Sequence, residues 1–138
     1  MYQIVTDLLS NHRFNGKIRL IYANTHPNDT ILLDELHLLS RQCPDKFSVT
    51  YLFETAVEDT LAMDKRILSG RITKDVLEQE ISLLQQKQED SVRPQIVVCG
   101  PDGMMRNVCG VKPIESQQGR VTGYLGDLGY SNASVVKL

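Results

Sequence analysis

The alternation of β-rich segments with helix-type segments constrains the fold more than any other feature of this sequence. Strands that are separated by helices form βαβ crossovers, which predict an α/β fold with a doubly wound, mainly parallel sheet. Ligands of such sheets bind at the carboxyl ends of the strands. The strands do not alternate strictly in polarity, which is typical of strands buried on both faces. They are expected at residues 17–22, 47–53, 95–99 and 135–138.

Helices are expected between these strands because apolar residues recur there at intervals of three and four positions. Asp29 or Thr30 is a candidate cap for the second helix, and Thr73 is a candidate cap for the third. Pro44 is expected to end the second helix. The helices are predicted at residues 2–10, 30–42, 73–84, 102–109 and 123–128, and the second is expected to bury Ile31, Leu32, Leu33, Leu36 and Leu39.

Residues 54–70 form the longest connection between expected strands and helices. Connections of this length inside a domain are usually surface excursions or segments that cover a ligand. A short helix is expected within this one, around Leu61.

Composition excludes several classes of protein. A length of 138 residues suits one domain, taken here to span residues 1–138. The formal net charge of -2 and the scattered Lys and Arg residues argue against a nucleic-acid partner. The apolar runs are far shorter than the roughly 20 residues of a membrane helix, so no membrane contact is expected from this chain itself.

The cysteines and histidines also argue against a metal. The three cysteines lack CxxC spacing, and the three histidines lack the paired spacing of metal ligands. We therefore expect free thiols and no bound metal. The N-terminal segment lacks the basic start of a secretory signal, which favours an intracellular location.

The most informative stretch for chemistry is IVVCGPDGMMRNVCG, residues 96–110. A buried strand brings Cys99 to its carboxyl end, and Gly100 allows a ligand to approach the backbone closely. The following helix presents free amides and the positive end of its dipole. The alternative interpretation is a core cysteine packed before a tight turn, because free cysteines are often buried.

Four segments together resemble one family. The motif CGPDGM, residues 99–104, resembles the cysteine-glycine-proline motif of the NAD-binding domain in the ferredoxin reductase and cytochrome-b5 reductase superfamily. YANTHPNDTILLDEL and SGRI, residues 22–36 and 69–72, resemble its second strand with the helix after it and its later glycine turn. GYLGDLGYSNASVVKL, residues 123–138, is similar to the C-terminus of fungal members. These segments span nearly the whole chain in the family's order.

The resemblance implies a Rossmann-like domain that binds NADH and delivers hydride to FAD held by a separate flavin-binding domain. It also implies an electron-acceptor protein, such as a haem protein of the cytochrome-b5 type. Cys99 is then expected beside the nicotinamide ring, where it adjusts the placement of the ring and does not act as a nucleophile. The residues expected along the nicotinamide ribose and pyrophosphate are Gly100, Pro101, Asp102 and Met104.

The resemblance places the adenosine end of the cofactor at other strand ends. Asn24 and Thr25 match positions near the adenosine ribose. Glu54 ends the next strand at a position where NADH-preferring relatives carry an acid, which accepts a ribose hydroxyl and repels the extra phosphate of NADPH. The alternative for Glu54 is a solvated glutamate without a ligand.

The beginning of the chain departs from the family's pattern. Members begin this domain with a strand and a loop of the kind GGTGITP, and residues 1–3 resemble the positions just after that proline. The central first strand, expected between the strands at 17–22 and 95–99, is therefore predicted to be missing, as is the flavin domain. We hypothesise that the true start codon lies farther upstream or that the reading frame is truncated. The isolated chain is then expected to be inactive. A full-length parent is expected at the endoplasmic reticulum or outer mitochondrial membrane.

Two other functions remain open at this point. The first is a degenerate, non-catalytic domain that keeps the fold and serves as an interaction or scaffold module, which the missing loop favours. The second is a doubly wound nucleotide-binding response or signalling module, which fits the periodicity but lacks an acidic cluster at a strand end. The CGPDGM motif favours the reductase.

Overall fold

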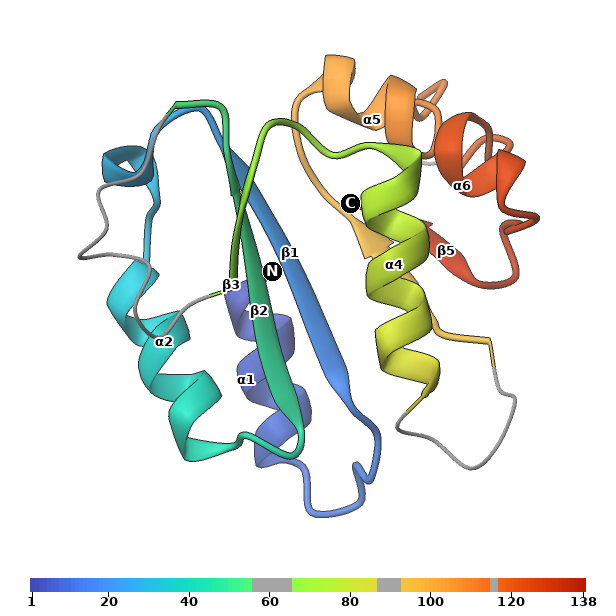
Figure 1. The fold of residues 1–138 in the computed structure, drawn as a ribbon. Coiled ribbons are helices and arrows are strands. Elements are labelled where there is room, and N and C mark those ends of the chain that lie inside the picture. The colour runs from blue at the N-terminus through green and yellow to red at the C-terminus, as the bar shows by residue number, and fades with distance from the viewer. Residues whose placement is uncertain (56–65, 87–92, 115–116) are drawn as a thin grey trace. The chain divides into compact units, whose positions relative to one another are not determined.

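The computed structural model describes residues 1–55, 66–86, 93–114 and 117–138. These residues form two compact units, Met1–Arg71 and Ile72–Leu138, and each is described by itself. All paired strands in both units run parallel, and helices alternate with them (Figure 1). The predicted parallel α/β fold class is confirmed.

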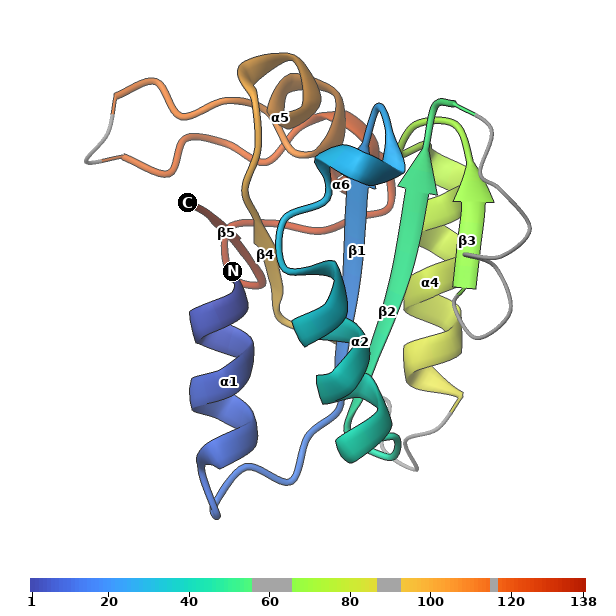
Figure 2. The same ribbon diagram turned by 90° about the vertical axis from the view of Figure 1, so that its left-hand side faces the viewer.

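The first unit contains a three-stranded parallel sheet in the order β1-β2-β3. Its strands are β1 (Ile18–Asn24), β2 (Phe47–Phe53) and β3 (Arg66–Ser69). Asn24 is paired with Phe53, and Phe53 is paired with Ser69, so the three strands end together. Figure 2 shows their carboxyl ends at the upper edge of the sheet. This common edge positions the residues that follow each strand.

Helices α1 (Tyr2–Ser10) and α2 (Leu33–Gln42) lie against the same face of this sheet (Figure 2). Alternate residues of β2 point toward them and form the core of the unit. The other face of β2 is also buried, because Thr50 and Leu52 are fully inaccessible. The core cluster consists of Val5, Leu36, Phe47, Val49, Tyr51 and Phe53.

Helix α2 begins later than predicted, and neither proposed cap is used. Asp29 belongs to the 3-10 turn η1 (Pro27–Asp29), and the amide of Thr30 closes this turn on the carbonyl of Pro27 at 3.0 Å. Leu32, in a left-handed conformation with φ 61°, precedes the helix without a side-chain cap. The predicted burial of Ile31 and Leu32 is wrong, since they are 73% and 37% exposed. The proline turn separates these residues from the helical apolar face.

The strand β3 lies inside the segment that the sequence interpretation treats as a loop. It has four residues, and its end residues Arg66 and Ser69 are exposed. So short and polar a segment lacks the alternation or apolar run that identifies strands. The helix expected around Leu61 lies outside the described residues.

The second unit pairs β4 (Ile96–Val98) in parallel with β5 (Val135–Lys137). Its helices are α4 (Lys74–Gln85), α5 (Asp102–Val108) and α6 (Gly123–Asp127). The predicted cap of α4 is confirmed, because the Thr73 hydroxyl accepts a hydrogen bond from the amide of Val76 at 3.3 Å. Strands β1 and β4 belong to different sheets, and a further strand between them stays a prediction.

Side chains that bind backbone groups hold the loops of the second unit. The Gln118 amide group donates to the carbonyl of Lys137 at 3.0 Å and accepts from its amide at 2.7 Å. Asn132 donates to the carbonyl of Gly119 at 2.6 Å and accepts from the amide of Val121 at 3.2 Å. Both side chains thus fix the loop before α6 to the segment around β5.

Across the parts of the chain that the structure describes, no helix is long and apolar enough to cross a membrane.

Candidate functional site

The carboxyl edge of the three-stranded sheet contains three of the predicted site residues. Asn24 ends β1, Thr25 follows it, and Glu54 follows β2. The two strand ends are joined by hydrogen bonds, because both the amide and the hydroxyl of Thr55 donate to the carbonyl of Thr25, at 3.1 and 3.0 Å. The parallel register therefore brings Asn24, Thr25 and Glu54 together, as a common ligand edge requires.

Asn24 also organises the turn after β1. Its side-chain amide donates to the carbonyl of Asp29 at 3.1 Å and lies 3.5 Å from the hydroxyl of Thr30. These contacts hold the turn that leads to α2, so its amide donors are engaged within the protein. Thr25 is exposed beside it and is open to a ligand.

Glu54 has a partner that the sequence interpretation missed. Its carboxylate Oε2 lies 3.0 Å from Nη2 of Arg71, and the exposed fractions of the side chains are 34% for Glu54 and 79% for Arg71. The hydrogen bond and the negative charge of Glu54 raise the pKa of the Arg71 guanidinium. Arg71 belongs to the quoted SGRI segment, whose glycine turn was the available signal.

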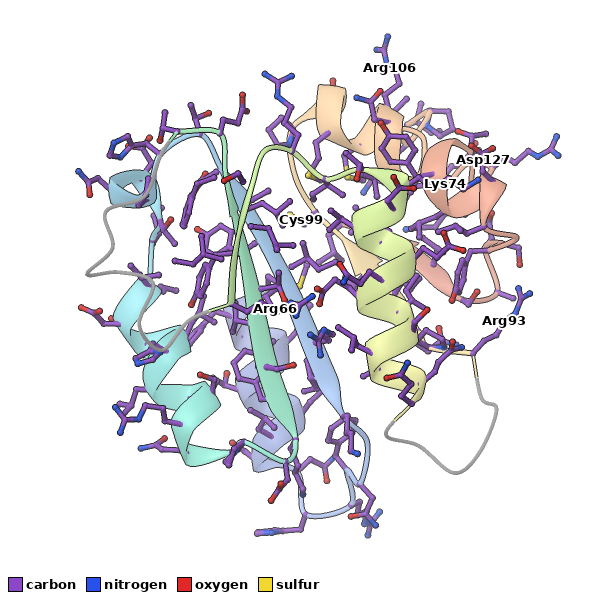
Figure 3. All side chains as sticks on the ribbon, in the orientation of Figure 1. Arg66, Lys74, Arg93, Cys99, Arg106 and Asp127 are labelled. Atoms are coloured by element: carbon purple, nitrogen blue, oxygen red, sulfur yellow. The ribbon has the colours of Figure 1, made fainter. Side chains whose placement is uncertain are left out.

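The second predicted site begins at the carboxyl end of β4, where Cys99 is exposed (Figure 3). The amide of Leu138 donates to the carbonyl of Val98 at 2.9 Å, so the ends of β4 and β5 are held together beside this cysteine. The alternative of a packed core cysteine is wrong for Cys99. Cys109 is the buried thiol instead, and burial raises its pKa while the charge of Lys137 lowers it.

The turn after Cys99 places the remaining predicted residues on one short segment. Pro101 precedes α5, and its carbonyl accepts from the amide of Met105 at 2.9 Å. Asp102 is exposed in the first turn of α5. The thioether of Met104 packs against Gly100, where a Cβ atom would meet its Sδ and Cε. A larger residue at position 100 would displace only the flexible end of the Met104 side chain.

A shallow pocket of about 290 Å³ lies beside this turn. It combines apolar side chains with the carboxylate of Asp102 and the ammonium group of Lys112. Among the described residues, no group of three or more His, Cys, Asp or Glu side chains could hold a metal ion. The pocket is lined by Gly100, Asp102, Met105, Val111, Lys112, Ile114 and Leu138.

The predicted residues thus fall into two sets, each brought together within its own unit. Asn24, Thr25 and Glu54 share the polar, charged edge of residues 1–71. The segment from Cys99 to Met104 provides a compact turn within residues 72–138. Arg71 at the first edge, and Val111, Lys112 and Ile114 at the second pocket, were not predicted. Apart from the glycine turn before Arg71, no motif identifies these residues from the sequence.

Curated proteins of similar sequence align with nearly the whole of this chain. The chain is 36% identical over 137 residues to NADH-cytochrome b5 reductase 2 of Kluyveromyces lactis. It is 34% and 31% identical, over the same length, to proteins of that name from Lodderomyces elongisporus and Aspergillus fumigatus. The alignments cover 99% of this chain but only 43%, 43% and 39% of these relatives. The chain therefore spans less than half the length of the curated relatives it matches.

A family match agrees with these relatives and with the fold. Residues 1–110 match the family described as the oxidoreductase NAD-binding domain. The matched range contains strands β1 to β4 and the CGPDGM segment, whereas β5 lies beyond it. Parallel strands with helices between them are the architecture of such dinucleotide-binding domains. This chain belongs to the oxidoreductase NAD-binding domain family.

Proposed function

We propose that this chain is the NADH-binding portion of a flavin-dependent reductase. The observation that carries the proposal is the exposed Cys99 at the carboxyl end of β4, followed by a Gly-Pro turn and inside the family match. The names of the relatives support a role in reduction by NADH. Because the chain spans less than half of those relatives, turnover is proposed for a reductase with a flavin-binding domain, and the isolated chain is proposed to be inactive.

The edge of residues 1–71 suits the adenosine end of the cofactor. Glu54 supplies a carboxylate that can accept a hydrogen bond from a ribose hydroxyl, and the exposed hydroxyl of Thr25 lies at the neighbouring strand end. The hydrogen bonds of Thr55 to Thr25 hold this edge in one arrangement before a ligand arrives. In our proposal, Asn24 maintains the turn, while Thr25 and Glu54 contact the ribose.

The turn at Cys99 suits the nicotinamide end. The exposed thiol and the neutral Gly100-Pro101 backbone offer a compact, uncharged surface against which a flat ring can lie. Asp102 adds a carboxylate in the first turn of α5, which favours a ribose hydroxyl over a phosphate at that position. We propose that Cys99 positions the ring and that Gly100, Pro101, Asp102 and Met104 border the adjacent ribose.

When bound, the nicotinamide supplies the hydride that reduces FAD, from which electrons pass singly to an acceptor such as a cytochrome-b5-type haem protein. The part of this chain is to bind and orient the cofactor. A displacement of about 1 Å at the reacting atoms can cost up to about 100-fold in rate, so the contacts of Cys99 matter even without a covalent role.

The proposal is tested first by calorimetric titration of the full 138-residue chain with NADH. The matched variant Glu54→Gln removes the charge of the carboxylate while keeping its size. We expect saturable binding by the wild type and weaker binding by the variant. No heat of binding in either protein would contradict the proposal.

The role of Cys99 is tested in a complete reductase. The matching segment of the Kluyveromyces lactis relative is replaced by this chain, with Cys99 or with Cys99→Ala. We expect the alanine variant to reduce the flavin roughly tenfold more slowly in stopped-flow measurements, with NADH affinity changed less than about twofold. Equal flavin reduction rates would show that the thiol does not place the ring.

A scaffold module is the second candidate. It is favoured by the fact that two predicted ligand groups already have partners within the protein, since Glu54 pairs with Arg71 and the Asn24 amide binds the turn after β1. The titration separates the two functions, because a scaffold that has lost its nucleotide site binds no NADH.

A further inference from the structure

The end of β2 carries a pair of opposite charges whose position depends on backbone geometry. The amide of Gly70 donates to the carbonyl of Phe53 at 2.7 Å, which fixes the end of β3 beside the end of β2. Gly70 has φ +102°, a conformation that side chains rarely adopt, and this turn brings Arg71 back to Glu54. The pair is thus built on two adjacent strand ends.

The pair contributes little to folding, because the side chain of Arg71 is 79% exposed and solvent screens its charge. Its placement instead determines the electrostatic character of the edge. A carboxylate alone at this position attracts a hydroxyl donor and repels a phosphate. With the guanidinium 3.0 Å away, the net charge of the pair is zero, and this repulsion is largely cancelled.

A guanidinium beside a carboxylate can also exchange partners. Arginine binds phosphate through two parallel hydrogen bonds, and these charge-assisted bonds are stronger than bonds between neutral groups. The exposed side chain of Arg71 has room to turn from Glu54 toward a phosphate at the same strand ends. The positive charge of Arg71 would then offset the negative charge of the phosphate, which lowers its repulsion by Glu54.

We propose that Arg71 is a specificity-determining residue that lets this edge accept the 2′-phosphate of NADPH as well as the 2′-hydroxyl of NADH. The inference rests on the proposed function and deepens it. Glu54 recognises the hydroxyl, and Arg71 recognises the phosphate. The chain therefore discriminates weakly between the two cofactors, although it carries the acid typical of NADH-preferring proteins.

The test compares dissociation constants of the full chain and of Arg71→Gln for NADH and NADPH by calorimetry. Two smaller probes, 5′-AMP and adenosine 2′,5′-bisphosphate, restrict the comparison to the adenosine end. Arg66→Gln is the control, because it removes the same charge from an exposed arginine at the opposite, amino end of β3 (Figure 3). Low ionic strength keeps the electrostatic contribution measurable.

We expect Arg71→Gln to weaken binding of NADPH and of the bisphosphate roughly tenfold, while NADH and 5′-AMP change less than about twofold. Arg66→Gln is expected to leave the ratio between the cofactors within about twofold of the wild-type ratio. Equal effects of Arg71→Gln on both cofactors, or none, would overturn the inference while NADH binding still supports the function. If the wild type binds neither NADH nor 5′-AMP, the proposed function fails, and the inference fails with it.

Discussion

The two units hold their candidate ligand edges by different means. In residues 1–71, the strands that end at Asn24 and Phe53 are supported by an apolar core built on Phe47 and Tyr51. In residues 72–138, apolar residues such as Leu125 and Val135 are buried as well, but the loops near β5 are held in addition by hydrogen bonds from single side chains, above all those of Gln118 and Asn132. Apolar packing distributes the stabilisation over many contacts, whereas a loop held by a few polar groups depends on each of them.

The two edges also present different chemical groups. The first edge presents an ion pair, whose charges indicate directly which ligand groups it attracts. The second edge presents a thiol and a Gly-Pro turn, with the carboxylate of Asp102 in the helix that follows. The ion pair therefore yields predictions about cofactor choice, and the proposed role of Cys99 yields predictions about placement and rate.

The largest expected effect on stability belongs to the apolar core. Phe47 is 2% exposed, and its truncation in Phe47→Ala is expected to lower the free energy of unfolding by roughly 4 kcal/mol, from lost burial and the cavity left behind. Urea denaturation measures the loss, and amide hydrogen exchange in β1–β3 locates it. Leu38→Ala is the control, because Leu38 is 56% exposed on α2. Equal effects of the two variants would show that the cluster around Phe47 is not a packed core.

The second unit is expected to be most sensitive at a glycine. Gly123 has φ +62°, and a Cβ atom there would meet the backbone carbonyl of Asn107. Gly123→Ala is expected to lower the free energy of unfolding by roughly 3 kcal/mol, because the left-handed conformation and the overlap both add strain. Thermal and urea denaturation measure this change.

Gly103 provides the matched control for Gly123. It lies in α5, and a Cβ atom there would meet nothing within 4 Å. Gly103→Ala is expected to raise stability by about 0.5–1 kcal/mol through better helix propensity. If both alanine variants were neutral, α6 would not depend on the turn at Gly123.

The sequence predicts much of the fold because several segments are governed by local rules. Regular apolar spacing places α1 at residues 2–10, and a β-rich run between polar stops places β2 at residues 47–53, as observed. Thr73 also caps α4 as predicted. The start of α2 cannot be found in this way, because Asp29 and Thr30 favour a cap in the sequence while Pro27 and Asn24 organise a separate turn.

Site residues can be predicted when they belong to one contiguous motif, but not when strand pairing brings them together. The motif at Cys99 is contiguous, and the end of a strand is readable from the apolar run before it, so Cys99 and its neighbours can be proposed from the sequence. Arg71 cannot, because its approach to Glu54 depends on the pairing of β2 with β3, a strand too short and polar to recognise. In this chain, the glycine turn at Gly70 was the sequence feature that pointed to the charged residue after it, Arg71.

A further small effect is expected for a polar atom inside the apolar core of the first unit. The hydroxyl of Tyr51 is buried, and among the described residues it has no hydrogen-bond partner. A buried hydroxyl without a partner lowers stability. Tyr51→Phe removes that oxygen and keeps the ring contacts with Tyr22 and Phe53, so it is expected to raise the free energy of unfolding by about 1 kcal/mol at neutral pH. A decrease would instead show that the hydroxyl binds a partner.

The pH dependence of the same variant separates burial of the hydroxyl from a change in packing. Burial, followed by the charges of Tyr22 and Asp34, raises the pKa of Tyr51 to about 12. Below pH 10 the residue is protonated in both the folded and unfolded states, whereas between about pH 10 and 12 only the unfolded state releases the proton. Ionisation of Tyr51 therefore lowers wild-type stability over that range, by about 1.4 kcal/mol per pH unit. The difference between wild type and Tyr51→Phe in urea denaturation isolates this contribution, because the remaining tyrosines titrate in both proteins. A difference that does not change between pH 9 and 12 would mean that Tyr51 is not desolvated in solution and that the apolar core around it is open to water.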